Sequence, residues 1–443
     1  ENISKTKSSL VAGITELWIK KFSSWDEISW EKEILSKRLA NWLLYYPIFI
    51  QILSKDFQIF FISVLHLQAR HLHRLSLFQT SCLDHFFSKK VQIFYNLMFN
   101  ERLLSLDSCL HNLSKQIEYE ILPDGCHRSR NPSFHFVALK NLLEIRDAMV
   151  LCDYQVPEYL NNSIQKMASI LKIFRFGDGE LCLFNGSRCG KREEIDILLE
   201  SSNSKNDVII EAVFGGFQRL IGGKSIVIIE SGVVSSVGHQ ENAGTLAFEF
   251  CHGRNRIIVN CGMPEHAQKI EKKYYRGTSA HSTVTINSIN SSELCGSSNM
   301  GSRRAFKTIS NRYESKKNIL IELGHNGYKD LFGVEHRRLL YLSSNGFDFR
   351  GEDIFLGDGI VSGEARFHLH PSVKALLVEK SGYVLLRLGK TEGWVFQASA
   401  EVVKLEESIY FGNGSKRQTC QIVVPFKYLN SPKILKWRLT REK

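Results

Sequence analysis

The periodicity of apolar residues changes near residue 173, and this change constrains the fold more than any other feature of the chain. Before it, glycine and proline are almost absent, and apolar residues recur at the spacings of three and four that mark one face of a helix. The clearest such segments are residues 28–44, 59–78, 91–104 and 134–150. Successive antiparallel helices of this kind stack into a bundle, a solenoid or a toroid. We therefore expect a helical domain over residues 1–172.

Beyond residue 173 the chain is built from short runs of strand-forming residues separated by turn residues. The hairpin signals Phe174–Gly179 and Asn185-Gly186 open this part. The runs that follow are residues 225–229, 245–251, 256–260, 282–286, 339–342, 383–388, 394–398 and 419–424. This pattern is typical of a large antiparallel sandwich. A length of 443 residues suits two domains, so we expect an α+β multidomain protein whose β-sandwich covers residues 173–443.

The composition indicates a globular protein with a basic surface. Hydrophobic residues make up 43% and charged residues 23% of the chain, which excludes a disordered protein. The net charge of +11 favours polyanionic partners, namely nucleic acid, a membrane surface or an acidic glycan. A solvated basic surface without a specific partner is the alternative. Because the chain lacks interleaved basic and aromatic residues, helix-turn-helix patterns and zinc-finger spacings, we expect no nucleic-acid partner.

Cysteine spacing and the most apolar segment exclude further classes. None of the ten cysteines forms a CxxC pair, which argues against zinc-ribbon and thioredoxin-like sites and favours mostly free thiols. The most apolar segment, residues 42–67, is interrupted by Pro47, Lys55 and Asp56, so we expect two buried helices there and no membrane span. The chain does not begin with Met and shows no signal peptide, and we expect an N-terminal truncation.

A polar loop between two apolar helices is the first candidate site. It reads Leu-Pro-Asp-Gly-Cys-His-Arg-Ser-Arg-Asn-Pro from Leu122 to Pro132. His127, Arg130 and Asn131 could converge on an anion beside the N-terminus of the following helix. The alternative is a capping loop, with Asn131 as the N-cap and the cations in water.

The β-rich part carries further candidates. Residues 238–250 include His239, and the Tyr-Tyr-Arg-Gly-Thr-Ser-Ala-His run brings Tyr275, Arg276 and His281. Tyr328 lies in a later His-Asn-Gly-Tyr run. For His281 the alternative is a histidine whose hydrogen bonds are satisfied at the start of a strand.

Two pairs of residues at regular spacing complete the candidates. His368 and His370 would share one face of a strand, a spacing that suits a metal ion or an ordinary polar pair. Gln68 and His71 would share one face of a helix, which either lines a cleft or is solvated.

In their order along the chain, these runs resemble the heparinase II/III family of polysaccharide lyases, in particular a bacterial branch with the pattern LPDGxHxSRNP. The resemblance implies an incomplete (α/α) toroid packed on a β-sandwich, with a cleft in which an acidic polysaccharide undergoes β-elimination at a uronic acid. It implies catalytic roles for His127, Arg130, Asn131, His239, Tyr275, His281 and Tyr328. It also implies substrate-binding roles for Gln68, His71 and Arg276.

The chain departs from the family pattern at two places. Where characterised members carry a catalytic tyrosine, this sequence has Phe134, which can transfer no proton. Some relatives hold a structural zinc ion, and the corresponding positions here are Gln240, Asn242, Asn260 and His281. Because amides are poor zinc ligands, we expect no metal and no other cofactor.

These departures leave two hypotheses for the function. The first is a lyase that cleaves a uronic-acid-containing polysaccharide, with Tyr275 or Tyr328 in place of the missing tyrosine. The second is a catalytically degenerate protein that binds acidic glycans. The family association suggests the cell envelope or periplasm, and a cytoplasmic location is the alternative.

Overall fold

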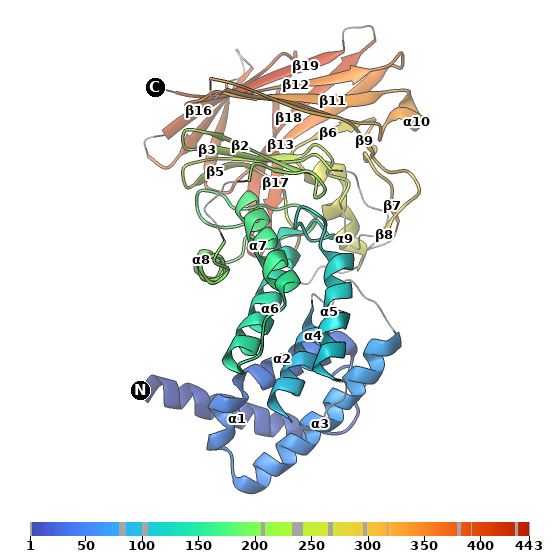
Figure 1. The fold of residues 1–443 in the computed structure, drawn as a ribbon. Coiled ribbons are helices and arrows are strands. Elements are labelled where there is room, and N and C mark those ends of the chain that lie inside the picture. Colours follow the sequence, from blue (N-terminus) through green and yellow to red (C-terminus); the bar gives the residue numbers. More distant parts are fainter. Residues whose placement is uncertain are drawn as a thin grey trace. The chain divides into compact units, whose positions relative to one another are not determined.

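A computed structural model describes residues 2–78, 86–99, 105–204, 209–232, 242–264, 269–295, 299–316, 318–378, 382–390, 392–429 and 433–442. The chain forms two compact units (Figure 1). Unit 1 comprises Glu1–Glu120 and Val137–Ile164, and unit 2 comprises Ile121–Phe136 and Gln165–Lys443. The single boundary predicted at residues 172–173 stays a prediction.

Helices account for all regular structure up to Ile173 in the described part of the chain. They are α1 (Asn2–Phe22), α2 (Lys32–Phe49), the 3-10 turn η1 (Ile50–Ile52), α3 (Lys55–Phe78), α4 (Phe87–Met98), α5 (Leu106–Glu120), α6 (Pro132–Leu151) and α7 (Glu158–Ile173). The apolar segment 42–67 is divided between α2 and α3, as its proline and charges indicated. None of the described helices is both long enough and apolar enough to cross a membrane.

Two large antiparallel sheets build unit 2. The strand order of the first is β1 (Glu211–Ala212), β2 (Phe217–Gly222), β3 (Ser225–Glu230), β4 (Phe248–His252), β5 (Asn255–Val259), β13 (Val361–Leu369), β18 (Arg417–Tyr428) and β17 (Lys404–Tyr410), with β6 (Val284–Ile286) paired to β13. That of the second is β14 (Val373–Val378), β15 (Tyr383–Leu388), β16 (Glu392–Ala398), β19 (Ile434–Arg441), β12 (Asp348–Leu356), β11 (Glu335–Leu342), β10 (Asn318–His325) and β9 (Lys307–Ser315). The prediction of a helical region followed by an antiparallel sandwich is confirmed.

Short elements precede the first sheet or lie between strands along the chain, and none of the three helices among them was predicted. The short elements are α8 (Arg192–Ser201), α9 (Lys269–Arg276), the 3-10 turn η2 (Thr278–Ala280), α10 (Lys329–Phe332) and the two-stranded sheet of β7 (Leu294–Cys295) and β8 (Asn299–Met300). The Tyr274–Arg276 segment, expected between strands, is therefore the end of helix α9.

Aromatic side chains from both sheets form the core of the sandwich. Phe248 of β4 stacks on Trp437 of β19 with ring centroids 5.4 Å apart, and Phe250 meets the edge of Trp394 of β16 at 5.3 Å. Strand β11 alternates between buried and half-buried residues, the period-two pattern of a strand with one face on a core. Such aromatic pairs each contribute about 0.5–1.5 kcal/mol beyond their buried area.

A charged network lies inside this core. Asp353 of β12 accepts hydrogen bonds from His336 Nε2 at 2.8 Å, Arg338 Nε at 2.6 Å and Trp437 Nε1 at 3.0 Å. The side chains of Asp353 and Arg338 are both 0% exposed. Arg338 also donates to the backbone carbonyls of Leu246 and Ser282. The network therefore joins the second sheet to the two segments that lead into strands β4 and β6 of the first sheet.

Candidate functional site

The predicted polar loop folds as a tight turn anchored on unit 2. Gly125 takes a left-handed φ of 95° and donates its backbone N–H to the carbonyl of Leu122. The carboxylate of Asp124 accepts the backbone N–H groups of Cys126, Phe214 and Gly215. These bonds hold the loop against the start of the first sheet, which explains why residues 121–136 belong to unit 2.

The backbone of Arg130 is left-handed, and its guanidinium has partners in unit 2. Its φ of 54° is left-handed, a conformation that costs about 1–2 kcal/mol for a residue with a Cβ. Nε donates to the carbonyl of Gly215 at 2.8 Å, and a terminal nitrogen lies 3.0 Å from Oε1 of Glu230. A Cβ on Gly232 would lie 2.5 Å from the terminal nitrogen, so that glycine makes room for it. The charge of Arg130 is thus paired with that of Glu230.

Asn185 connects the polar loop to the sandwich. Its Nδ2 donates to Oε1 of Glu230 at 2.8 Å and to the carbonyl of Arg130 at 3.1 Å. Its Oδ1 accepts the backbone N–H of Asn242, and its own carbonyl accepts Nδ2 of Asn131 at 2.7 Å. The Asn185-Gly186 pair was interpreted as a turn alone, and nothing in the sequence marked Asn185 or Glu230 as members of a site.

Asn131 has two partners at once. Its Oδ1 accepts the backbone N–H of Phe134 at 3.0 Å, the bond of an N-cap on helix α6. Its Nδ2 reaches Asn185. The interpretation of Asn131 as a helix cap is therefore confirmed, and the same side chain also joins the cluster.

His281 and Asn242 form the opposite side of this cluster. His281 Nδ1 lies 2.8 Å from the carbonyl of Gly277 and must donate to it, so Nε2 carries the lone pair and accepts Asn242 Nδ2 at 3.1 Å. Burial lowers the pKa of His281, which keeps the ring neutral near pH 7. Among the described residues, no donor reaches Asn242 Oδ1 or Glu230 Oε2, although both side chains are buried.

The polar cluster therefore comprises Arg130, Asn131, Asn185, Glu230, Asn242 and His281. Of the residues predicted for the site, the structure brings Arg130, Asn131 and His281 together. Among the described residues, two acceptor oxygens of the polar cluster have no hydrogen-bond donor. A buried acceptor without a donor costs about 1–3 kcal/mol, so a ligand that supplied hydroxyl or N–H groups would be favoured here.

His127 is buried beside the cluster, in the anchored loop. Its Nδ1 lies 2.8 Å from Ser129 Oγ, and its backbone N–H donates to the ring of His135. Burial, with a smaller contribution from Arg128, lowers the pKa of His127 to about 4. Its ring is neutral at pH 7, and no direct bond to His281 is formed among the described residues.

Two predicted residues of the β-rich part, Tyr328 and Arg276, are not members of this cluster. Tyr328 is 0% exposed in the sandwich core and donates its hydroxyl to the carbonyl of Val284 at 2.8 Å. This hydroxyl is bound within the sandwich core and not to the polar cluster, and a catalytic Tyr328 stays a prediction. Arg276 is also 0% exposed, with a guanidinium nitrogen 3.4 Å from Met300 Sδ, which does not support direct substrate binding. His239 lies outside the described residues.

Tyr275 is half-buried and lines a hollow whose lining also includes Ser279 and Ala280, the two residues before His281. Its half-buried ring meets the edge of Phe411 at 5.0 Å and borders a hollow of about 460 Å³ that also reaches His368, Glu407 and Lys416. Burial, with smaller contributions from Glu271 and Cys261, raises the pKa of Tyr275. No hydrogen bond among the described residues links Tyr275 to the polar cluster.

Gln68 and His71 lie on helix α3 of unit 1. Gln68 is buried and accepts hydrogen bonds from Arg38 Nε at 3.3 Å and from a terminal nitrogen of Arg38 at 3.0 Å. His71 packs edge-on against Trp30 at 5.2 Å. Gln68 is therefore part of the packing of unit 1 and not of a solvated surface. A substrate-binding role for the two residues stays a prediction.

The positions that correspond to the zinc ligands of relatives do not fit a zinc ion. Asn260 Oδ1 accepts the backbone N–H of Ser282 at 2.9 Å, and its Nδ2 donates to the carbonyl of Leu183. Gln240 lies outside the described residues. The described chain offers no group of three or more His, Cys, Asp or Glu residues able to hold a metal. The prediction that zinc is absent stays a prediction.

Histidines 368 and 370 have separate partners. His368 binds Ser408 Oγ at 2.8 Å and the carbonyl of Ser279 at 3.0 Å, while His370 binds Ser372 Oγ at 2.7 Å. Strand β13 ends at Leu369, between the two residues. Their spacing therefore reflects two independent polar contacts and not a shared ligand.

Next to Asn260, Glu249 is a fully buried carboxylate. It accepts the backbone N–H groups of Asn260 at 2.8 Å and of Leu183 at 3.2 Å. Burial raises its pKa to about 7.

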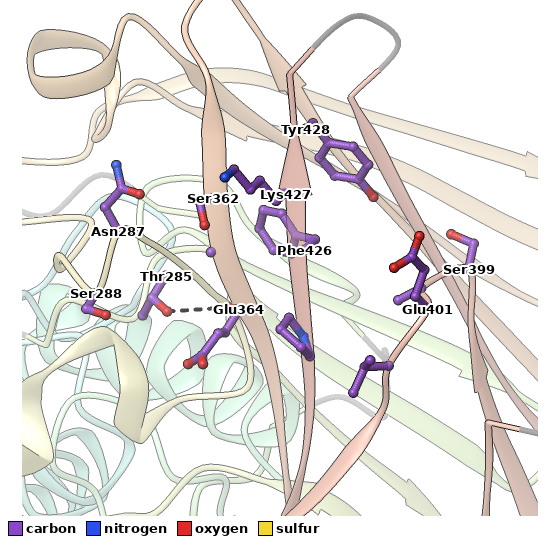
Figure 2. Close-up of a pocket in the computed structure, with 14 residues that line it drawn as sticks. Thr285, Asn287, Ser288, Ser362, Glu364, Ser399, Glu401, Phe426, Lys427 and Tyr428 are labelled. Atoms are coloured by element: carbon purple, nitrogen blue, oxygen red, sulfur yellow. Dashed lines mark hydrogen bonds between the residues drawn. The ribbon is translucent and has the colours of Figure 1, made fainter. Parts of the chain in front are cut away.

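A hollow of about 590 Å³ lies between strands β6, β13 and β18 and the segment that follows β16 (Figure 2). Figure 2 shows Phe426, Lys427 and Tyr428 of β18 between Glu364 of β13 and Glu401. With two carboxylates and one lysine, its lining is unfavourable for a polyanion. No residue predicted for the site lines this hollow.

Comparison with known proteins extends over both parts of the chain. The family model "Heparinase II/III N-terminus" matches residues 15–204, and "Heparinase II/III-like, C-terminal" matches residues 209–438. The FtsZ-localized protein C of Caulobacter vibrioides is 27% identical over 362 residues, which cover 76% of this chain and 61% of that protein. This chain therefore spans less than two thirds of the length of that relative.

Solved structures show the same fold at low identity. A heparinase III gene product superposes with a TM-score of 0.76 at 15% identity, covering 98% of this chain and 74% of that one. The heparan sulfate lyase HepC of Pedobacter heparinus gives 0.69 at 14%, covering 98% and 72%. A chondroitinase AC lyase gives 0.58 at 8%, covering 98% and 71%. These likenesses confirm the predicted fold class.

Proposed function

Because the chain belongs to the heparinase II/III family, we propose that it cleaves a uronic-acid-containing acidic polysaccharide by β-elimination at the polar cluster. The observation that carries the proposal is the buried, neutral His281 beside two acceptor oxygens that no donor of the described residues reaches. A buried polar site in which two acceptor oxygens have no donor among the described residues suits a sugar, whose hydroxyl groups would complete the hydrogen bonds. The basic net charge of +11 suits an acidic polymer.

The chemistry requires three groups. The uronate carboxylate must be neutralised so that the C5 proton becomes acidic, a base must remove that proton, and an acid must protonate O4 as the C4–O4 bond breaks. The electrons of the C5–H bond become the C4=C5 double bond. The charge of Arg130 is already paired with Glu230, so neutralisation falls to a side-chain amide.

Asn242 and His281 can supply the first two groups together. The amide N–H of Asn242 now donates to His281 Nε2. If that N–H turned to a bound carboxylate, it would neutralise the substrate and free the lone pair of Nε2 to accept the C5 proton. The lowered pKa of His281 ensures that this nitrogen is unprotonated before the reaction.

The acid is the group that departs from the family pattern. Phe134 has no proton to give, and Tyr328 is buried in the core. Tyr275 is the accessible tyrosine among the predicted residues, and we assign it the proton transfer to O4. Replacement by phenylalanine tests this role, because Tyr275→Phe should abolish turnover while heparin still binds.

The primary experiment is incubation of the protein with heparin, heparan sulfate, alginate, hyaluronan and polygalacturonate. The absorbance of the unsaturated uronate in the ultraviolet reports elimination. His281→Ala should lose the signal, and His111→Ala, at an exposed position on helix α5, should keep it. A signal that survived in His281→Ala would contradict the proposed base.

A catalytically degenerate, glycan-binding protein of the same fold is the second candidate. Phe134 at the position of the family tyrosine and the paired charge of Arg130 favour it. This candidate predicts heparin binding without unsaturated product from any of the five polymers. Asn242→Ala should then change the affinity for heparin but leave the product at zero.

The same family assignment supports a proposal for the place of action. The related Caulobacter protein is named for its localisation with FtsZ. We propose that the substrate of this chain is a polysaccharide of the cell envelope. Fractionation of cells that express a tagged full-length protein tests this, and a purely cytoplasmic protein would contradict it.

A further inference from the structure

In two adjoining hollows at one end of the sandwich, the charged residues of the lining are mostly cations. The first, of about 490 Å³, is bordered by Lys224, Arg254 and Arg441. The second, of about 480 Å³, is bordered by Lys374, Arg387 and Lys390. Both hollows also border Glu392, which therefore marks the place where they meet. We call these six cationic residues the basic rim.

Turns between strands create the first hollow. The backbone N–H of Gly253 donates to the carbonyl of Lys224, which places the β2–β3 and β4–β5 turns side by side. Lys224 and Arg254 thus project from adjacent turns, and both are exposed. Arg441 lies over the ring of Phe347 at 4.8 Å. Neither Lys224 nor Arg254 forms an ion pair with any residue that the structure describes.

Cross-strand pairing creates the second hollow. Lys374 of β14 lies directly opposite Arg387 of β15, and both are exposed. Like charges at opposite positions destabilise a sheet, and an anion bound between them would remove this cost. Arg387 faces Gly393 of β16 on its other side, where the absence of a side chain deepens the hollow. The guanidinium of Arg387 also donates to the carbonyl of Lys390, and this bond orients the Arg387 side chain.

Glu392, the acidic residue between the hollows, already accepts hydrogen bonds from neighbouring side chains. Glu392 accepts Trp394 Nε1 at 3.0 Å and Asn255 Nδ2 at 3.1 Å, and its side chain is 13% exposed. Its Oε1 also lies 3.7 Å from Nε of Arg441, so one of the six rim cations has an ion-pair partner. Glu442 is the other carboxylate of the lining. Six cations therefore face two carboxylates, in contrast to the acidic hollow of Figure 2. The basic rim is the more favourable of these surfaces for a polyanion.

The basic rim is separate from the polar cluster. Glu230 is the last residue of strand β3, whereas Ser225, beside Lys224, is the first. Five residue steps of about 3.3 Å place the two ends roughly 17 Å apart along the strand. A polymer bound at the rim therefore need not touch His281.

We propose that the basic rim is a second binding site for an acidic polysaccharide, one that holds the polymer by its sulfate or carboxylate groups. The ligand class rests on the proposed function, while the location rests on the rim alone. Two adjoining hollows suit a linear chain whose charges repeat. The aromatic rings are unsuited to stacking on bases, because Trp394 is 0% exposed and Phe347 lies under Arg441. The rim thus favours a glycan over single-stranded nucleic acid.

The test compares two variants with the same change in net charge. The rim variant carries Lys224→Gln, Arg254→Gln, Lys374→Gln and Lys390→Gln, all at exposed positions. The control carries Lys307→Gln, Lys404→Gln, Arg417→Gln and Lys427→Gln, also exposed and outside the rim. The affinity of the full chain for fluorescent heparin, hyaluronan and duplex DNA is measured between low and physiological salt. Circular dichroism and thermal unfolding confirm that both variants are folded.

We expect the rim variant to bind heparin at least about tenfold more weakly at low salt, because each lost contact is worth up to about 1 kcal/mol in water. The salt dependence of its Kd should be less steep, by up to about four in the logarithmic slope. The control should change less than about twofold. Equal losses in both variants would mean that net charge alone governs binding and would overturn the proposal. So would a rim variant that lost DNA binding but kept heparin binding.

This test is independent of turnover. If none of the five polymers yields unsaturated product, the lyase proposal fails while a selective loss in the rim variant still supports the rim. If product forms and the rim variant binds heparin like the wild type, only the rim proposal fails. If both proposals hold, the rim variant should cleave a short oligosaccharide at the normal rate and the polymer with a raised KM.

Discussion

Replacement of Asp353 by asparagine tests the charged network in the sandwich core. The carboxylate accepts hydrogen bonds from His336, Arg338 and Trp437, and its side chain is 0% exposed. Asparagine keeps the size of the side chain but removes the charge and turns one acceptor into a donor. The guanidinium of Arg338 would then be a buried cation without a counter-ion.

The size of the effect follows from this burial. Removal of one partner of a buried ion pair costs about 3–5 kcal/mol. For domains of 150–250 residues, each 1 kcal/mol shifts Tm by roughly 2–4 °C. We therefore expect Tm of unit 2 to fall by about 10 °C in Asp353→Asn. The other bonds of Arg338, to the carbonyls of Leu246 and Ser282, do not neutralise its charge.

Urea unfolding followed by tryptophan fluorescence measures the change, because Trp437 lies against Asp353. Glu352→Gln is the matched control. Glu352 neighbours Asp353 on strand β12 and pairs with Lys436 at 3.1 Å on the partly exposed surface, so its loss should cost less than about 1 kcal/mol. If Asp353→Asn cost no more than this control, the argument from the buried charge would be refuted.

The pH dependence of stability supplies a second check of the same network. Burial alone would raise the pKa of Asp353, but Arg338 and His336 hold it below its usual 3.8. The stabilisation is therefore present above the unfolded pKa of about 3.9 and is lost as pH falls through the lower, folded pKa. Asp353→Asn should remove this part of the acid-induced loss of stability.

Three further outcomes are expected. Gly232→Ala should destabilise unit 2 by about 1–3 kcal/mol in urea unfolding, because its Cβ would lie 2.5 Å from Arg130, whereas Gly13→Ala, with nothing within 4 Å, should not destabilise unit 1. The ring signals of His127 should titrate in NMR near its pKa of about 4, and a midpoint near 6.5 would contradict the burial of the ring. Burial raises the pKa of Glu249 to about 7, so its contribution to stability is full below about pH 4.3 and falls as pH rises through 7. A stability profile without a decline in that window would contradict this.

The order of helices and strands was predictable because it follows from local periodicity. The alternation in β11 and the proline and charges at the α2–α3 junction are signals of single segments. Helices α8, α9 and α10 were missed because each is short, and α9 carries a single aliphatic residue among charges and tyrosines. Residues 121–136 belong to unit 2 because Asp124 accepts hydrogen bonds from backbone N–H groups some 90 residues further along the chain. No local sequence pattern reveals such a contact.

The candidate site was predictable only in part, for the same reason. His281, Arg130 and Asn131 stood out as polar residues in apolar surroundings. Asn185 and Glu230 join them through contacts that span more than 40 residues, and in sequence they are a turn residue and a strand end. Tyr328 and Arg276 have the residue types of a catalytic site, but residue type alone could not reveal that both are buried.

The alternation of the chain between the two units affects how it can be made and cut. Synthesis releases residues 121–136 before any strand of the first sheet exists, so this loop must wait for its partners while α6 and α7 emerge. A fragment that began at residue 173 would lack Asp124 and Arg130, and a fragment that ended at residue 172 would keep both without Gly215 and Glu230. Neither fragment would therefore carry the complete set of these contacts into a fusion protein. Fusion partners and protease sites are better placed at the chain ends than at the helix-to-strand transition.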